Sequence, residues 1–256
     1  MLNVVVAVNN AEVLGHNLLA SPDVAAGRIH CRLVGDSRTA MEALKRGMES
    51  VTSTVVALIH QDVYLPFGWL ARVERVLMEL QSAGTRWGVL GVWGIGWNRR
   101  MCGRVWCTGG GQEHRGLPPL TPSEVATIDE IVILLNRDAR FEPDLRLPGY
   151  HLYATDLAMQ ALDQGFKTYV IDAPVVHNSA TKLRLDSEYY ECYRYMQQKW
   201  QHRLPVPTPV LELTRYGMPI VRRRLGEVKQ TLLARGRIHA RHPDPAQLSH
   251  ELGYDA

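Results

Sequence analysis

The sequence predicts an α/β fold, in which a mostly parallel sheet carries helices on both faces. Short segments rich in β-branched and apolar residues alternate with segments whose apolar residues recur at helical intervals. Polar residues follow directly after several of the apolar segments, at what would be the carboxyl edge of such a sheet. Ligands of doubly wound α/β proteins bind beyond that edge, so we expect the functional residues to lie there.

The alternation starts near the first residue and accounts for most of the chain. The expected strands cover residues 3–8, 30–34, 53–59, 88–95, 128–136, 167–171 and 175–179. The expected helices cover residues 39–50, 68–81 and 155–164, and a further helix starts at residue 186. Residues 98–123 are irregular and contain Gly109-Gly110-Gly111, which predicts a mobile loop over the site.

The composition is that of a globular protein: of 256 residues, 46% are hydrophobic and 21% are charged. The net charge of +3 is too small to indicate nucleic-acid binding. The start of the chain lacks a signal-peptide pattern, and no segment reaches the roughly 18 apolar residues of a membrane span. The four cysteines form neither a CxxC pair nor a zinc-site pattern, so we expect free thiols in a cytoplasmic protein.

Asp62 is the first candidate for a functional role. It follows the apolar strand expected at residues 53–59, in the sequence His60-Gln61-Asp62. A carboxylate at this edge suits a hard divalent cation, which neutralises charge on a leaving diphosphate. Capping of the following turn is an equally good explanation of Asp62 from the sequence alone.

Asp156 is the second candidate, at the start of the helix expected at residues 155–164. An ionised aspartate there suits a general base that removes a proton from an attacking hydroxyl. Helix capping or compensation of the helix dipole explains the same position, and the spacing does not decide between these roles.

His177 is the third candidate, near the end of the strand expected at residues 175–179. A neutral imidazole binds manganese-like ions well. A hydrogen-bonded structural histidine is the alternative.

Together, these segments resemble the family-2 glycosyltransferases of GT-A fold, in the branch that carries a Gln-Asp or Asp-Asp motif after the third strand. The resemblance covers about residues 3 to 200. The segments that carry it are Val4 to Asn10, His60-Gln61-Asp62, Ile128-Asp129-Glu130, residues 149–156 and His177-Asn178-Ser179.

The resemblance implies a GT-A-like, Rossmann-type catalytic domain over residues 1–204 that binds a nucleotide-sugar. The prolines at residues 205, 207 and 209 and the basic residues after them predict a helical basic extension over residues 205–256. The resemblance implies that Asp62 binds the metal and the diphosphate, and that His177 completes the metal site. It also implies that Asp156 is the catalytic base. Asp129 would position the sugar or the acceptor, and Asp36 would hold the nucleoside.

Two positions depart from the family pattern. His60 stands where the usual metal motif has its first acid, and Thr155 stands where many relatives have a second acid. We expect His60 and Gln61 to bind the donor or the acceptor. Because of the two departures, we also expect weaker metal binding or an altered nucleotide preference.

The expected activity is an inverting, metal-dependent transfer from a UDP-sugar, with Mn²⁺ or Mg²⁺ as cofactor. The acceptor is left open between a carbohydrate, a lipid-linked molecule and a protein. A non-catalytic nucleotide- or carbohydrate-binding protein and a nucleotide-sugar hydrolase are the alternatives.

Two basic segments complete the candidates. Lys182 and Arg184 suit closure over a donor diphosphate, although a solvated basic loop explains them equally well. Residues 214–242 combine eight basic residues with interspersed Ile, Val and Leu. Such a helix can lie on an anionic membrane surface, or it can pack its apolar side on the domain.

Overall fold

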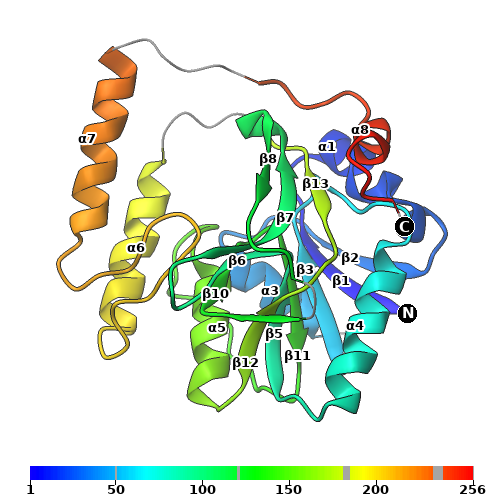
Figure 1. Ribbon diagram of the computed structural model, residues 1–256, viewed down its shortest axis with the longest axis horizontal. Coiled ribbons are helices and arrows are strands. Elements are labelled where there is room, and N and C mark those ends of the chain that lie inside the picture. The colour runs from blue at the N-terminus through cyan, green and yellow to red at the C-terminus, as the bar shows by residue number, and fades with distance from the viewer. Residues whose placement is uncertain (50, 120–121, 181–184, 233–238, 256) are drawn as a thin grey trace.

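A computed structural model describes residues 1–49, 51–119, 122–180, 185–232 and 239–255, and for residues 228–232 it describes the backbone alone (Figure 1). Within these residues, no helix is long and apolar enough to cross a membrane.

A seven-stranded sheet forms the centre of the molecule. Its order is β2 (Ile29–Val34), β1 (Leu2–Ala7), β3 (Val55–Ile59), β11 (Val132–Asn136), β5 (Trp87–Gly91), β12 (Lys167–Val170) and β9 (Ser123–Val125). Strand β1 is parallel to β2 and β3, and β12 is parallel to β5. Only β11 and the edge strand β9 run in the opposite direction among these strands. The predicted α/β class with a mostly parallel sheet is therefore confirmed.

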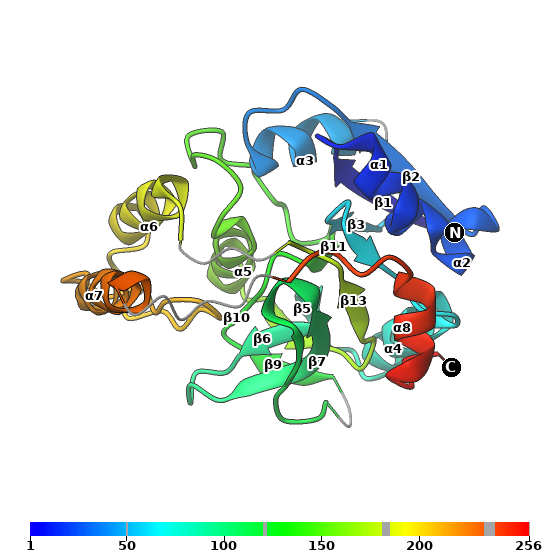
Figure 2. The same ribbon diagram turned by 90° about the horizontal axis from the view of Figure 1, so that it is seen from above.

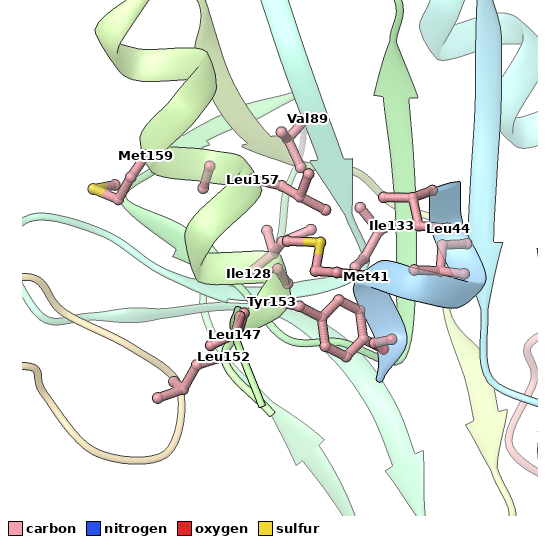
Figure 3. Packing of buried hydrophobic residues seen from close by; sticks show 14 of the residues in the cluster. Met41, Leu44, Val89, Ile128, Ile133, Leu147, Leu152, Tyr153, Leu157 and Met159 are labelled. Atoms are coloured by element: carbon pink, nitrogen blue, oxygen red, sulfur yellow. The ribbon is translucent and has the colours of Figure 1, made fainter. Parts of the chain in front are cut away.

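Helices cover both faces of this sheet because alternate strand residues point to opposite sides. Helices α3 (Ala40–Met48) and α5 (Tyr153–Asp163) pack on one face, together with Val5 and Ile133. Figure 3 shows this packing, with Met41 and Leu44 of α3 beside Ile133. Helix α4 (Trp69–Ser82) packs on the other face, in one apolar cluster with Val4 and Val6 of β1.

A second sheet stands at the carboxyl edge of the first. Its order is β10 (Thr127–Ile128), β6 (Trp93–Ile95), β7 (Met101–Cys107), β13 (Val175–His177) and β4 (Val63–Tyr64), with β8 (Gln112–Arg115) paired to β7. The predicted irregular loop at residues 98–123 is therefore wrong over β7 and β8. A short 3-10 helix, Thr108–Gly110, and Gly111 at a φ of 61° connect these two strands. The glycines that indicated a loop form this turn.

The N-terminal third contains short helices that the sequence did not predict. They are α1 (Ala11–His16), the 3-10 helix Leu18–Ala20 and α2 (Pro22–Ala25). The side chain of Asn10 caps α1 by accepting the N–H of Val13 at 3.0 Å. Each helix is too short to show a helical repeat of apolar residues, which explains why the pattern was missed.

The C-terminal region contains α6 (Ser187–Lys199), α7 (Met218–Leu232) and α8 (Pro245–Glu251). Residues 205–256 return to the body of the molecule in two places. Val206 and Leu213 are fully buried in the main core, and Leu248 and Tyr254 pack against Val176 of β13. Figures 1 and 2 show α7 at the periphery, beside α6.

Candidate functional site

Strand ends from both sheets bring Asp62 beside His177. Asp62 lies between β3 and β4, and β4 pairs with β13 so that Val63 stands opposite His177. The N–H of Asn178 donates to the carbonyl oxygen of Asp62 at 2.8 Å. Because this pairing fixes the backbone on both sides, the two side chains meet at one place on the sheet edge.

His60, Asp62 and His177 form a cluster with the composition of a metal site. One potential ligand atom from each of the three side chains lies within 4.8 Å of the others. The distance between Asp62 Oδ1 and His177 Nε2 is 3.4 Å. Ligands of one transition-metal ion stand about 2.0–2.2 Å from it, so small side-chain movements would let all three bind one cation. The donor set therefore fits the divalent cation that the sequence predicted.

The charges of Asp62 and His177 stabilise each other. Burial opposes ionisation of both groups, but the charge and hydrogen bond of His177 outweigh it and hold the pKa of Asp62 well below its usual range. Burial of His177 is likewise outweighed by Asp62 and by Cys107, which together raise the pKa of His177 to about 10. A cation at this place would replace the imidazolium proton, because a ligating imidazole must be neutral.

His60 is a member of this cluster that the sequence placed only among the residues binding donor or acceptor. Burial, opposed by the charge of Asp62, lowers the pKa of His60, which favours the neutral imidazole that a metal needs. Its Nε2 lies 2.7 Å from the hydroxyl of Tyr153, and this hydroxyl donates to the carbonyl oxygen of Glu130 at 3.3 Å. Tyr153 thereby orients the His60 ring, as hydrogen-bond partners of ligating histidines do.

The cluster opens into a cavity of about 1350 Å³. This volume exceeds the range of about 300–1,000 Å³ typical of small-molecule sites. Five predicted site residues line the cavity, namely His60, Gln61, Asp62, Asp129 and His177. Lys182 and Arg184 lie outside the described residues.

Asp156 is not at the cavity, which argues against its predicted role as base. Its side chain is fully buried and accepts hydrogen bonds from Trp200 Nε1 at 2.8 Å, Gln160 Nε2 at 2.8 Å and Lys199 Nζ at 2.9 Å. Lys199 and Trp200 stand at the end of α6, so Asp156 joins α5 to α6. The neighbouring Thr155 lines the cavity instead, because successive helix residues point to different sides.

The remaining predicted residues differ in their placement. Asp36 is exposed after β2, with a φ of 51°, and does not line the cavity, so its contact with a nucleoside stays a prediction. Gln61 Oε1 accepts the backbone N–H groups of Asn9 and Asn10, both at 3.1 Å, and so ties the end of β1 to the metal cluster. Asp129 accepts the N–H of Ile131 at 3.2 Å.

Glu130 is a cavity residue to which the sequence assigned no role. Burial and the adjacent charge of Asp129 raise the pKa of the Glu130 carboxyl to about 8. Its Oε1 accepts the N–H of Leu152 at 2.7 Å, which fixes its direction at the start of α5. In the sequence, only its position beside Asp129, after a short strand, could have indicated that Glu130 is a site residue.

Cys107 and His114 are two further cavity residues that the sequence did not single out. Burial of the Cys107 thiol is outweighed by hydrogen bonds with His114 and His177, which lower the pKa of the thiol to about 5. Both residues belong to the hairpin β7–β8, in the segment predicted as an irregular loop, so no pattern in the sequence related them to His177.

Comparisons with known proteins give distant similarities. No protein-family model matches the sequence. The curated protein "ATP synthase subunits region ORF 6" of Fuscovulum blasticum is 26% identical over 156 residues. The match covers 59% of this chain and 61% of that protein, so the chain spans less than two thirds of the relative's length.

Three solved structures are similar at low scores. GalNAc-T7 with UDP, GalNAc and Mn²⁺ has a TM-score of 0.46 and 11% identity, covering 79% of this chain and 51% of that chain. The mannosyltransferase PcManGT from Pyrobaculum calidifontis, in complex with GDP-Man and Mn²⁺, has a TM-score of 0.45 and 14% identity, covering 98% and 79%. The inositol-1-phosphate CTP transferase from T. maritima has a TM-score of 0.39 and 11% identity, covering 77% and 97%. At these values the similarity does not identify the function of this chain.

Proposed function

We propose that this chain is a metal-dependent glycosyltransferase that uses a nucleotide-sugar, with a UDP-sugar as the expected donor. One observation carries the proposal: His60, Asp62 and His177 converge at the carboxyl edge of an α/β sheet, inside a cavity of about 1350 Å³. Such an edge is where doubly wound folds bind nucleotides.

His60, Asp62 and His177 would hold the divalent cation, Mn²⁺ or Mg²⁺. When bound, the cation supplies positive charge that neutralises a leaving diphosphate. Gln61 and Asn9 border the same part of the cavity, and their mutual hydrogen bonding keeps the loop after β1 close to the diphosphate position. Asp36, Lys182 and Arg184 remain proposed donor contacts.

We propose Glu130, supported by Asp129, as the base in place of Asp156. In an inverting transfer, the acceptor oxygen bonds to the anomeric carbon while the bond from that carbon to the diphosphate breaks, and the acceptor proton passes to the base. A base works best when its pKa is close to the working pH, and the pKa of Glu130 is raised to about 8. Its fixed hydrogen bond to Leu152 and its place in the cavity support this role.

A second candidate is a non-catalytic protein that binds a nucleotide or a carbohydrate. The position of Asp156 supports this candidate, because the residue that the resemblance implied as the base does not line the cavity. A nucleotide-sugar hydrolase is the third candidate function, in which water takes the place of the acceptor.

Calorimetric titration with UDP, GDP and CDP, with and without Mn²⁺, tests the donor site. We expect metal-dependent binding of one nucleotide and its loss in Asp62→Ala, while the control variant Asp172→Ala keeps it, since Asp172 is an exposed residue outside the cavity. Incubation with the matching nucleotide-sugar then distinguishes the three candidate functions. Release of free sugar without acceptor identifies a hydrolase, and binding without any turnover identifies a binding protein. No nucleotide binding by folded protein would refute the proposal.

A further inference from the structure

Helix α7 presents an apolar stripe to the solvent. Met218, Val221 and Leu225 are 50%, 49% and 66% exposed, and we call these three residues the outer stripe. Residues at spacings of three, four and seven lie on one side of a helix. The sequence left open whether the apolar side of this helix packs on the domain. In the structure, the side chains of the outer stripe do not pack on it but face the solvent.

The opposite side of α7 holds the helix in a fixed orientation. Glu227 is 7% exposed and accepts hydrogen bonds from the N–H of Leu185 at 3.0 Å and from the hydroxyl of Tyr190 at 3.2 Å. Ile220 packs against the main core. Arg224 lies over the Tyr190 ring, 4.2 Å from its centroid. These contacts tie α7 to α6, so the outer stripe cannot turn inward without breaking them.

Two exposed arginines, Arg215 and Arg222, border the outer stripe. Arg222 lies on the same side of the helix, one turn after Met218, and the exposed Arg215 and Tyr216 immediately precede the helix. Tyr216 is 82% exposed. An exposed apolar stripe bordered by basic residues is the arrangement of helices that lie in the interface of anionic membranes.

The size of the stripe favours a lipid surface over a protein partner. A stable protein interface buries about 800 Å² on each partner, whereas three side chains on one helix offer far less. An interfacial helix needs only a narrow apolar strip, and arginines near an anionic bilayer add electrostatic attraction to the lipid phosphates.

We propose that α7 docks this protein on an anionic bilayer, with Met218, Val221 and Leu225 inserted among the headgroups and the neighbouring arginines paired with lipid phosphates. Arg223 and Glu227, on the other side of the same helix, line the large cavity. Docking through α7 therefore brings the cavity wall close to the membrane. If the proposed glycosyl transfer also holds, the acceptor is a molecule carried by that membrane.

Vesicle sedimentation tests the docking. We expect the full chain to sediment with phosphatidylcholine vesicles that contain phosphatidylglycerol, not with phosphatidylcholine alone, and to be released as salt rises. The double variant Val221→Glu with Leu225→Glu should weaken binding at least about tenfold, because it removes the inserted side chains and adds repulsive charge. The control is Met78→Glu, at a residue of α4 that is 61% exposed.

Three results would overturn the proposal. They are absence of binding to anionic vesicles, equal binding by the double variant and the wild type, and dimerisation of the wild type that the double variant abolishes, which would assign the stripe to a second copy of the chain. Circular dichroism establishes that the variants fold. Calorimetry with nucleotide and Mn²⁺ is a separate measurement, so the docking and the transferase proposals can fail independently.

Discussion

His60 is the residue whose role changes most between sequence and structure. If it is the third ligand of the cation, His60→Ala should weaken Mn²⁺ binding by about 10- to 100-fold, because the ion loses one of three protein ligands. Electron paramagnetic resonance of free Mn²⁺ during a titration measures this affinity. The control is His16→Ala, a histidine of α1 outside the cavity. Unchanged Mn²⁺ affinity in His60→Ala would exclude His60 from the site.

Glu130 should make the stability of the fold depend on pH. Its pKa is raised to about 8 in the folded protein from an ordinary value of 4.5, so the folded state holds this proton more tightly than the unfolded chain does. The resulting stabilisation is complete below 4.5 and is lost as the pH rises through about 8. Glu130→Gln carries no such proton, and its stability relative to the wild type should therefore increase over this interval, by up to about 5 kcal/mol.

Urea unfolding of both proteins near the two ends of that interval measures the difference. The exposed Glu49→Gln serves as the control and should follow the wild type at every pH. A constant difference between Glu130→Gln and the wild type would show that Glu130 has an ordinary pKa.

Asp156 should stabilise the fold. Asp156→Asn removes the charge that Lys199 contacts at 2.7 Å and weakens the acceptor for Trp200, so we expect a loss of about 2 kcal/mol in the free energy of unfolding. The matched control is Asp163→Asn, whose partner Arg203 is exposed, and its loss should stay below about 1 kcal/mol. A variant of full stability that has lost only turnover would restore Asp156 as the base.

The sequence predicted part of the candidate site from single residues. Asp62 and His177 lie close together, as predicted, because β4, which directly follows Asp62, pairs with β13 of the second sheet. The role of Asp156 could not be read from the sequence, since its partners Lys199 and Trp200 come from a distant helix. The raised pKa of Glu130 arises from burial, which spacing along the chain does not describe.

Among the structural elements, β7 depends on a single glycine. Gly103 has a φ of 101°, and a Cβ at this position would overlap the carbonyl oxygen of Val92. Gly103→Ala should therefore destabilise the protein by about 3 kcal/mol or more, which thermal unfolding can measure. The control is Gly15→Ala in α1, where nothing lies within 4 Å of the added Cβ, and a small gain is expected. Equal stability of the two variants would contradict the described path of β7.

Elements with a clear periodic pattern were predicted well, and the strands of the glycine-rich segment were not. Helix α4 shows a clear helical repeat, and the observed Trp69–Ser82 is close to the predicted 68–81. Strands β7 and β8 were missed because their glycines indicated a loop, although β7 pairs with β6, β8 and β13. Strand pairing, in the hairpins β6–β7 and β7–β8 and with the distant β13, therefore decided the structure where the local composition favoured irregular chain.

At the scale of the whole molecule, two sheets meet at the site. The large sheet positions His60 and Asp62 through β3, and the smaller sheet positions His177 through β13. Helix α8 packs behind β13, where Leu248 and Tyr254 contact Val176. The sequence predicted the first sheet from its alternating pattern. In the second sheet, the sequence predicted the segments of β6 and β13 as strands, whereas β7 and β8 fall in the segment predicted as a loop.

A crystal structure of the protein grown with Mn²⁺ and UDP, with anomalous data collected at the manganese edge, tests the central claim most directly. We predict one strong anomalous peak among His60, Asp62 and His177, with the diphosphate of UDP bound to the same ion. A crystal that contains UDP elsewhere, or manganese away from these three side chains, would contradict the proposed donor site.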